Sequence, residues 1–223
     1  IAINSTTGVN FSVSGNYIGG SSAACGGSPW TKTNTFNNLF YGININAGTG
    51  TPSSIQNNTI RNISWSNSLN GTWTGIYIGG GDVNIGTVTG NTIGDITGTG
   101  SITVTSATSG SSLYGIVISS SGTVDCRNNK IGSITAANAA SNASDINAIY
   151  KNASAGTTTI SNNTIGSTTT ANSIYASSTS TGNAQYVHGI LNNGTGAVTI
   201  SGNTIANLTN GSVNTSTTTK GEV

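Results

Sequence analysis

The sequence predicts an all-β solenoid, in which the chain winds through about six coils of stacked parallel strands. The first observation is a phrase of the form Val/Ile-x-x-Asn-x-Ile, which recurs six times between residues 13 and 205, at intervals of 33 to 42 residues. The second is an upstream phrase, Gly-Ile-x-Ile or a close variant, which begins at residues 42, 75, 115, 148 and 189. Glycine-rich turns separate the phrases. A repeat of this length indicates a stack of supersecondary units.

Each repeat unit is expected to contain three short strands. The Gly-Ile-x-Ile segment forms the first, the Val/Ile-x-x-Asn segment the second, and the segment after the Asn bend the third. Apolar and polar residues alternate over these runs and β-branched residues are frequent, which is typical of strands. Equivalent strands should therefore lie parallel in successive coils, with Ile stacked on Ile in the core.

The asparagine of the repeated phrase is predicted to form a ladder along the solenoid. Asparagine tolerates the left-handed backbone conformation that a sharp bend can require. Its side-chain amide can also hydrogen-bond to the copies above and below it. The predicted ladder consists of Asn16, Asn58, Asn91, Asn129, Asn163 and Asn203.

These motifs resemble the PbH1-type repeat of right-handed parallel β-helices, and the resemblance covers residues 9–209 of a single segment, 1–223. It implies a right-handed parallel β-helix of about six coils. That fold occurs in polysaccharide lyases and hydrolases, phage tailspikes, adhesins and structural fibres. The Ser/Thr/Asn/Gly-rich repeats also resemble large secreted proteins of Bacteroidetes-type bacteria, often cargo of type IX secretion. This second resemblance implies an extracellular, bacterial cell-surface location and a segment of a longer exported protein.

Variation in unit length is expected between the third strand and the next Gly-Ile-x-Ile phrase. The expected inserts comprise residues 64–74, 97–114, 135–147 and 169–188, and an opening insert covers residues 20–41. Repeat proteins place such insertions on one face, and that face often binds ligands. The sequence therefore predicts loops on one side of the solenoid.

The low charge of the chain argues against two classes of partner. Only 6 Lys+Arg and 5 Asp+Glu occur among 223 residues, and the basic residues are scattered along the sequence. Nucleic-acid binding requires clustered cations, so no nucleic-acid partner is expected. No run approaches the roughly 18 apolar residues of a membrane span, so no membrane insertion is expected. Cys126 takes a predicted core position, Cys25 lies in the opening insert, and no disulfide between them is expected.

Residues for catalysis or for metal binding are not grouped in the sequence. Asp82, Asp95, Asp125, Asp145 and Glu222 share no position in adjacent repeats, and His188 is the single histidine. We therefore expect no enzyme activity, no metal and no cofactor. The alternative, a polysaccharide-degrading lyase or hydrolase, would require Asp82 or Asp95 to meet a partner across coils. We expect Asp125 to form a local ion pair with Arg127.

The aromatic residues suggest carbohydrate binding, because sugar rings stack on aromatic side chains. Trp30, Trp65, Trp73, Tyr77 and Tyr114 lie in or beside the expected inserts and are the candidate glycan-binding residues. Packing of an insert on the flank of the solenoid is the competing explanation for them. The predicted function is an extracellular structural or adhesive module, with a surface polysaccharide or other segments of the same protein as partners.

Ice binding is a further alternative. Ser and Thr recur four and two residues before the ladder asparagine, as in Ser12 and Ser14 or Thr159 and Ser161. A flat array of this kind resembles the ice-binding face of some β-solenoids. Gln56, Asp125 and Arg127 interrupt the array.

Overall fold

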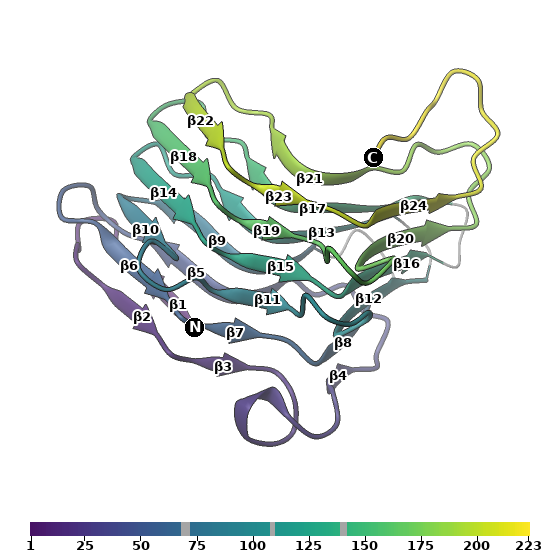
Figure 1. The fold of residues 1–223 in the computed structure, drawn as a ribbon, viewed down its shortest axis with the longest axis horizontal. Coiled ribbons are helices and arrows are strands. Elements are labelled where there is room, and N and C mark those ends of the chain that lie inside the picture. The colour runs from purple at the N-terminus through teal and green to yellow at the C-terminus, as the bar shows by residue number, and fades with distance from the viewer. Residues whose placement is uncertain (68–71, 108–109, 139–141) are drawn as a thin grey trace.

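The computed structural model describes residues 1–67, 72–107, 110–138 and 142–223, and these residues form a right-handed parallel β-helix of six coils. Four sheets of six parallel strands run the length of the solenoid, and each coil contributes one strand to each sheet (Figure 1). The first coil lies at one end of the stack and the last coil at the other. The predicted fold class is confirmed.

Each sheet takes one strand from every coil. Sheet A contains β1 (Ala2–Asn4), β5 (Phe40–Asn46), β9 (Thr72–Gly80), β13 (Ser111–Ile118), β17 (Ser144–Lys151) and β21 (Val187–Asn192). Sheet B contains β2 (Ser12–Ser14), β6 (Ser53–Gln56), β10 (Val83–Ile85), β14 (Thr123–Arg127), β18 (Thr157–Ser161) and β22 (Ala197–Ser201). Sheet C contains β3 (Tyr17–Ile18), β7 (Thr59–Ile60), β11 (Thr92–Gly94), β15 (Lys130–Gly132), β19 (Thr164–Ile165) and β23 (Thr204–Ile205). Sheet D contains β4 (Trp30–Lys32), β8 (Ile63–Asn67), β12 (Ile102–Ser106), β16 (Ile134–Asn138), β20 (Ile174–Ser178) and β24 (Leu208–Ser212).

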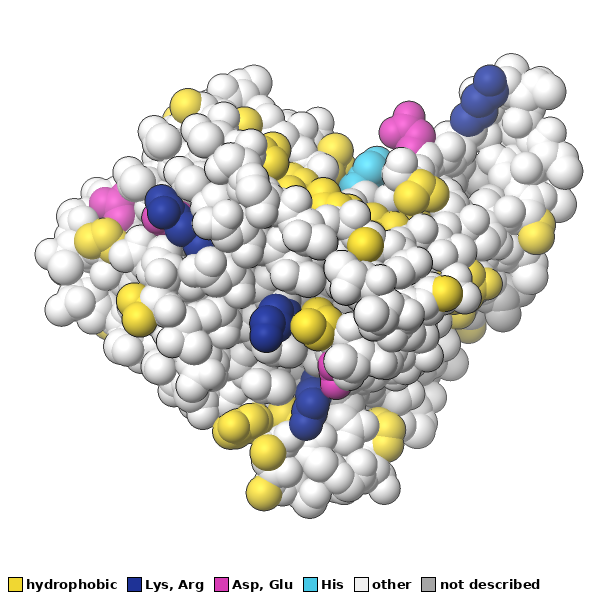
Figure 2. Space-filling view, viewed as in Figure 1, with side chains coloured by type: hydrophobic (Ala, Val, Ile, Leu, Met, Phe, Trp, Pro, Cys, Tyr) yellow, Lys and Arg dark blue, Asp and Glu magenta, His cyan; other side chains and the backbone are white. Residues whose placement is uncertain are grey.

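Charged side chains are few on the face shown in Figure 2, and the basic ones do not gather in a patch. The polar coat of the solenoid consists mainly of uncharged Ser, Thr and Asn. Solubility therefore depends on hydrogen bonding of these groups with water, and the sheets carry little surface charge.

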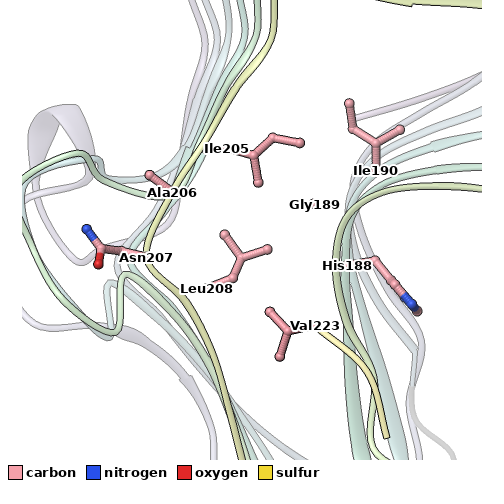
Figure 3. Close-up of a pocket in the computed structure, with 8 residues that line it drawn as sticks. All are labelled: His188, Gly189, Ile190, Ile205, Ala206, Asn207, Leu208 and Val223. Carbon is pink, nitrogen blue, oxygen red and sulfur yellow. The ribbon is translucent and has the colours of Figure 1, made fainter.

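Columns of identical or similar apolar residues fill the interior. The sheet C column contains Ile18, Ile60, Ile93, Ile131, Ile165 and Ile205, in the predicted register. Its four central members are fully buried, as are the equivalent residues of sheets A, B and D in the central coils. At the last coil the columns end in Ile190, Ile205 and Leu208, which project into the open interior (Figure 3). Burial of these columns is the main source of stability in a chain with so little charge.

Each coil contains four strands, one more than expected. The expected third strand divides into a short strand of sheet C and a separate strand of sheet D, because the chain turns between them. The expected inserts supply the sheet D strands and the beginnings of the sheet A strands, so most of their described residues are regular β-structure. The described parts of these inserts therefore consist of strands of sheets D and A together with the turns that connect them. Residues 68–71, 108–109 and 139–141 of these inserts lie outside the described part of the chain.

One copy of the repeated phrase is out of register. Val88 stands three residues before Asn91, where the copies in the first, second, fourth and fifth coils place a buried residue, yet Val88 is 86 % exposed. Ile85 takes the column position instead, between Ile55 and Cys126. The extra residues after Ile85 project outward, and Gln56 holds them by accepting hydrogen bonds from the backbone N–H groups of Val88 and Thr89.

The lengths of the corners between sheets C and D also differ from expectation. The sheet D column begins at Trp30 and continues through Ile63, Ile102, Ile134, Ile174 and Leu208. The residues five positions after each ladder asparagine would include Ser21, Ile96 and Thr168, but these three do not belong to the column. The corners of the first, third and fifth coils are longer than those of the other coils, so the aligned residues there fall in turns.

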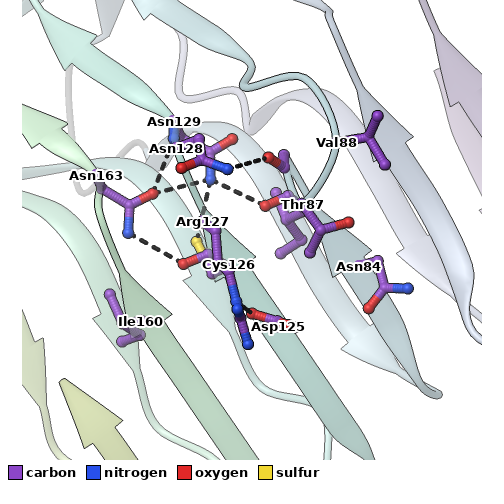
Figure 4. A network of polar contacts seen from close by, with 12 residues as sticks. Asn84, Thr87, Val88, Asp125, Cys126, Arg127, Asn128, Asn129, Ile160 and Asn163 are labelled. Carbon is purple, nitrogen blue, oxygen red and sulfur yellow. Dashed lines mark hydrogen bonds and ion pairs between the residues drawn. The ribbon is translucent and has the colours of Figure 1, made fainter. Parts of the chain in front are cut away.

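The asparagine ladder forms as predicted. The backbone N–H and Nδ2 of Asn129 both donate to Oδ1 of Asn163, at 2.9 and 3.0 Å, and the same pair of bonds links all six members (Figure 4). The four central members are at most 1 % exposed. The left-handed conformation belongs to the preceding residue in five coils, such as Asn57 with φ of 54° and Asn128 with φ of 57°, and the ladder asparagines themselves do not adopt it.

The two cysteines are free and buried. Cys126 lies in the sheet B core column, as predicted, and burial raises the pKa of its thiol to about 12. Cys25 ends a short 3-10 helix, η1 (Ala23–Cys25), in the corner of the first coil, and its Sγ contacts the carbonyl oxygen of Thr59.

Candidate carbohydrate-binding face

The three tryptophans of the predicted glycan site belong to an aromatic cluster in the N-terminal part of the core. Trp73 and Phe40 are neighbours in sheet A, and their rings stack with centroids 5.1 Å apart. Trp65 points inward from sheet D, with its ring 5.0 Å from that of Phe40. Trp30 packs edge-on against Phe40 at 6.0 Å.

This position corrects the assignment of Trp73 to a sugar-binding surface. Trp73 is fully buried, so a sugar has no access to its ring. Trp65 packs against the core, and its indole Nε1 is buried. Trp30 is the first residue of the sheet D column and is half exposed at the end of the solenoid. The packing explanation given above accounts for the tryptophans.

The tyrosines lie on the opposite, outward side of sheet A. Tyr41 and Tyr114 belong to one outward column, and Tyr77 and Tyr150 belong to the next. The two columns are separated by a corner at Gly75, which the strand pairing skips. A Cβ at Gly75 would lie 2.7 Å from the carbonyl oxygen of Gly115, so only glycine allows the strands to approach this closely. We call these four residues, with Thr74, the tyrosine face.

The tyrosines form two pairs, each joining successive coils. The rings of Tyr41 and Tyr77 are 5.3 Å apart with a 59° interplanar angle, and those of Tyr114 and Tyr150 stack at 5.2 Å and 27°. A small cavity of about 150 Å³ lies between the pairs, and its other lining residues are Thr72, Thr74, Val117 and Asn152. Drug-sized ligands occupy sites of about 300–1,000 Å³, so this site suits one ring of a larger molecule.

Thr74 lies at the centre of the tyrosine face and supplies an unused polar group. Its side chain is 1 % exposed, and its Oγ1 has no hydrogen-bond partner among the described residues. A buried hydroxyl without a partner costs about 1–3 kcal/mol. Thr74 is also one of the residues that line the cavity between the tyrosine pairs.

A polar column borders the tyrosine face. Thr72, Ser112 and Asp145 lie side by side on β9, β13 and β17, and together with Ser111 they line a second hollow of about 360 Å³. Burial raises the pKa of the Tyr114 hydroxyl, and a hydrogen bond from Ser112 partly opposes this. These side chains offer the donors and acceptors that fix the orientation of a sugar beside an aromatic platform.

Titratable groups gather where the tyrosine face meets the last coil. Nδ1 of His188 lies 2.8 Å from Oδ1 of Asn147, and its Nε2 lies 3.6 Å from a carboxylate oxygen of Glu222. The ring of Tyr186 stacks on His188 at 5.7 Å. Burial raises the pKa of the Asp145 carboxyl, while a hydrogen bond from the Tyr186 N–H and the nearby His188 lower it in part. The sequence did not predict this grouping, because residue 222 joins it only through the folding of the C-terminal segment.

The other carboxylates have structural partners. Asp82 accepts hydrogen bonds from the N–H of Gly50 at 2.7 Å and of Thr123 at 2.6 Å, and so ties turns of three coils together. Asp95 lies 3.5 Å from Arg61, and Asp125 forms the predicted ion pair with Arg127 (Figure 4). The alternative prediction of an enzyme relied on Asp82 or Asp95. Asp82 instead accepts hydrogen bonds from turns, and Asp95 lies beside the cation Arg61.

The Ser/Thr columns proposed for ice binding are less regular than the sequence suggested. Along the outer side of sheet B, one column reads Ser12, Ser54, Asn84, Asp125, Thr159 and Thr199. Asn84 replaces Thr87 in this column because of the shifted register at Val88, as Figure 4 shows. Two successive coils therefore lack a hydroxyl in the column.

Metal-ligand clusters and membrane-spanning helices are both absent from the described residues. No group of three His, Cys, Asp or Glu side chains there could hold a metal ion. No helix in the described part of the chain is long and apolar enough to cross a membrane.

Comparison with known proteins adds no family to this description: no family model, no curated protein and no solved structure matches the chain.

Sequence reasoning identified Tyr77 and Tyr114 but not Tyr41, Tyr150 or Thr74 as members of one site. A usable signal was present, because Tyr41, Tyr114 and His188 occupy the same place before the Gly-Ile-x-Ile phrase. Position in the column, and not proximity in the sequence, determines which aromatic residues share a surface.

Proposed function

We propose that this chain is a non-catalytic structural and adhesive module that binds a neutral carbohydrate chain along its tyrosine face. The observation that carries the proposal is the pairing of four outward tyrosines around Thr74, whose buried hydroxyl has no partner. Solvent-facing aromatic pairs next to an unpaired hydroxyl match the two requirements of a sugar, an apolar ring face and a rim of hydroxyl groups.

The repeat of the tyrosine pairs supports a chain ligand. The pairs occupy coils two and three, then four and five, of the six coils, and neighbouring coils lie about 4.8 Å apart. An extended polysaccharide that runs parallel to the solenoid axis would meet a tyrosine pair every second coil. Each contact is weak alone, and several contacts along one chain add to a useful affinity.

The charges around the face favour a neutral ligand. The outward residues of the described parts of β5, β9, β13 and β17 include no Lys or Arg, and Asp145 is the one carboxylate among them. An acidic polysaccharide would lack a cationic partner there and would meet Asp145 with the same sign of charge. We therefore assign the ligand to the class of neutral glycans.

The location and context are proposed on separate grounds. The low charge and the PbH1-type repeat favour an extracellular, bacterial surface protein of the Bacteroidetes type, in which this chain is one segment. A surface polysaccharide or other segments of the same protein are the expected partners. Antibodies against the chain should label intact cells of the source bacterium, and labelling only after permeabilisation would contradict the location.

The binding proposal is tested by isothermal titration with a panel of soluble neutral and acidic polysaccharides. Tyr114→Ala should weaken binding of the neutral ligand about 5- to 12-fold, because a lost stacking contact removes about 1–1.5 kcal/mol. Tyr17→Ala is the matched control, since Tyr17 is 61 % exposed on β3, away from the face. Equal binding by both variants, or binding of acidic chains only, would contradict the proposal.

The same samples separate adhesion from degradation and from ice binding. A reducing-sugar assay on each bound polysaccharide should show no increase over time. Product release that Asp145→Asn abolishes would replace the proposal with the polysaccharide-degrading alternative. Thermal hysteresis in the absence of any glycan binding would favour the ice-binding alternative instead.

A further inference from the structure

The rings on the outer side of sheet A alternate between two columns. The column before the glycine corner contains, from the second coil to the sixth, Tyr41, Thr74, Tyr114, Asn147 and His188. The column after the corner contains, in the same coils, Asn44, Tyr77, Val117, Tyr150 and Leu191. A ring therefore stands before the corner in every even coil, and after it in the third and fifth coils. We call the row formed by Tyr41, Tyr77, Tyr114, Tyr150 and His188 the aromatic zigzag.

Each step of the aromatic zigzag advances by one coil and crosses to the other column. Neighbouring coils lie about 4.8 Å apart. The ring centroids of Tyr41 and Tyr77 are 5.3 Å apart, and those of Tyr114 and Tyr150 are 5.2 Å apart. The row therefore repeats after two coils, with successive rings displaced to alternate sides of a line parallel to the solenoid axis.

The residues between the rings are covered. Thr74 is 1 % exposed, Val117 is 5 % exposed and Asn147 is 6 % exposed, whereas the four tyrosines are only half-buried. Short side chains thus alternate with rings in both columns. A molecule that lies along this side of sheet A meets the rings first.

Polar side chains border the aromatic zigzag on both sides. Before the first column lie Thr72 and Ser112, which line the hollow of about 360 Å³. Beyond the second column lie Asn46, in a hollow of about 450 Å³ that Tyr77 also lines, and Asn152, whose Oδ1 accepts a hydrogen bond from Ser119. The surface is therefore a row of rings with hydroxyl and amide groups along each edge.

One class of neutral glycan has the same symmetry as this surface. Pyranose sugars joined by β-1,4 bonds form a flat, extended ribbon in which each sugar is turned over relative to its neighbour. Each sugar advances by about the height of one coil. The two faces of the ribbon carry C–H groups, and its hydroxyl groups project from both edges. Chains with β-1,3 or α-1,4 bonds curve into helices, so they leave a straight row of rings after a few sugars.

We propose that the ligand is a β-1,4-linked neutral glycan, which lies along the solenoid axis with one sugar over each ring of the aromatic zigzag. This inference rests on the carbohydrate-binding function proposed above and adds the linkage, the direction and the length of the ligand. The turn between successive sugars matches the crossing between columns, so every sugar meets a ring in the same way. The five rings, from Tyr41 to His188, bind about five sugars.

Hexasaccharides that differ only in linkage test the proposal. Isothermal titration of the chain with cellohexaose, laminarihexaose and maltohexaose compares β-1,4, β-1,3 and α-1,4 bonds between the same glucose units. Mannohexaose and xylohexaose extend the β-1,4 series to other sugars. The best β-1,4 hexasaccharide should bind at one site per chain and about tenfold or more tighter than laminarihexaose and maltohexaose, because the curved chains lose ring contacts. In that β-1,4 series, affinity should rise with length up to the pentasaccharide and then level off.

Variants at separate points of the row test whether one ligand spans it. Tyr41→Ala and Tyr150→Ala lie three coils apart, and each should weaken binding of the β-1,4 hexasaccharide about 5- to 12-fold. Tyr150→Phe keeps the ring and should retain binding. Tyr17→Ala, on β3, should also bind like the unaltered chain. Circular dichroism of each variant confirms the fold.

The outcomes separate this inference from the proposed function. If laminarihexaose or maltohexaose binds more tightly than every β-1,4 hexasaccharide, and Tyr114→Ala weakens it, carbohydrate binding stands and the linkage is overturned. A β-1,4 hexasaccharide that loses affinity in only one of Tyr41→Ala and Tyr150→Ala would overturn the alignment along the axis. Binding of polysaccharides without binding of any β-1,4 hexasaccharide would also refute this inference alone. If no neutral glycan binds, both proposals fail.

Discussion

The aromatic cluster of Trp30, Phe40, Trp65 and Trp73 lies inside the solenoid, the tyrosine face lies on its outer side, and the two regions share strands β5 and β9. In β9, Trp73 is fully buried, and Tyr77, four residues later, faces outward. A regular strand would direct both to the same side, since side chains alternate with a period of two. The corner at Gly75 interrupts this alternation, so the residues after it point to the opposite side from the one that a regular strand would give them. A single glycine therefore separates an aromatic residue of the core from one of the outer surface.

The two regions also differ in how their polar groups are used. The indole Nε1 atoms of Trp65 and Trp73 are buried without partners in the described structure, and they face packed side chains. The hydroxyl of Thr74 is equally unpaired, but Thr74 is one of the residues that line the cavity between the tyrosine pairs. An unpaired group in a filled core only costs stability, whereas one beside a cavity can contribute to binding.

The largest expected difference between the regions concerns stability. Trp73→Ala should lower the free energy of unfolding by about 3–5 kcal/mol, because it leaves a cavity in the stacked core. Tyr77→Ala removes a half-buried ring from the surface and should cost about 1 kcal/mol. Urea denaturation followed by circular dichroism measures both values.

Trp73→Phe is the control for the core position. It keeps most of the buried ring and removes the unpaired N–H, so the loss should be much smaller than that of Trp73→Ala. Equal losses of stability for Trp73→Ala and Tyr77→Ala would contradict the placement of Trp73 in the core and of Tyr77 on the outer side of β9.

Much of the fold could be predicted from the sequence because the repeat supplies six independent copies of each core position. The ladder asparagines and the sheet C isoleucines were placed correctly, since a shift of one residue would expose a whole column. Val88 was misplaced because its phrase matches the other copies in sequence. Only the pairing of Ile85 with its neighbours reveals the extra residues.

The candidate site was harder to predict because the pairing of strands, which the repeated phrases do not show, determines which way its side chains point. Trp65 and Trp73 lie where the repeat pattern is weakest, and their inward orientation depends on strand pairing with neighbouring coils. The tyrosine pairs join residues 36 positions apart, Tyr41 with Tyr77 and Tyr114 with Tyr150. Each pair crosses between two columns on either side of the glycine corner, which alignment of single columns does not show.

Thr74→Val sharpens the comparison with a smaller change. The substitution keeps the shape of the side chain and removes the unpaired hydroxyl, so the free energy of unfolding should stay equal or rise by about 1 kcal/mol. Binding of the neutral glycan should weaken at the same time. Titration calorimetry and urea denaturation on one preparation measure both effects, and a loss of stability without a loss of binding would contradict a ligand role for Thr74.

The smallest expected effect is a pH dependence from Asp145, which borders the tyrosine face. Burial raises the pKa of this carboxyl above its ordinary value of 3.8, so the folded state holds a proton that the unfolded state has lost. The free energy of unfolding therefore falls as the pH rises from about 3.8 through the raised pKa. Asp145→Asn should remove this slope and be more stable than the unaltered chain at neutral pH, with the difference vanishing below pH 3.8. Asn keeps an oxygen that can accept the 2.8 Å bond from the Tyr186 N–H.

The neighbouring titratable groups determine the control for this last experiment. His188, Glu222 and Tyr114 face Asp145 or the groups beside it, and Glu222 is the other carboxylate of this grouping. Glu222→Gln should leave the slope assigned to Asp145 in place, because the side chain of Glu222 is 70 % exposed. A slope that disappears in Glu222→Gln and persists in Asp145→Asn would assign the effect to the C-terminal segment. In that case the burial of Asp145 at the edge of the tyrosine face would have no measurable influence on folding.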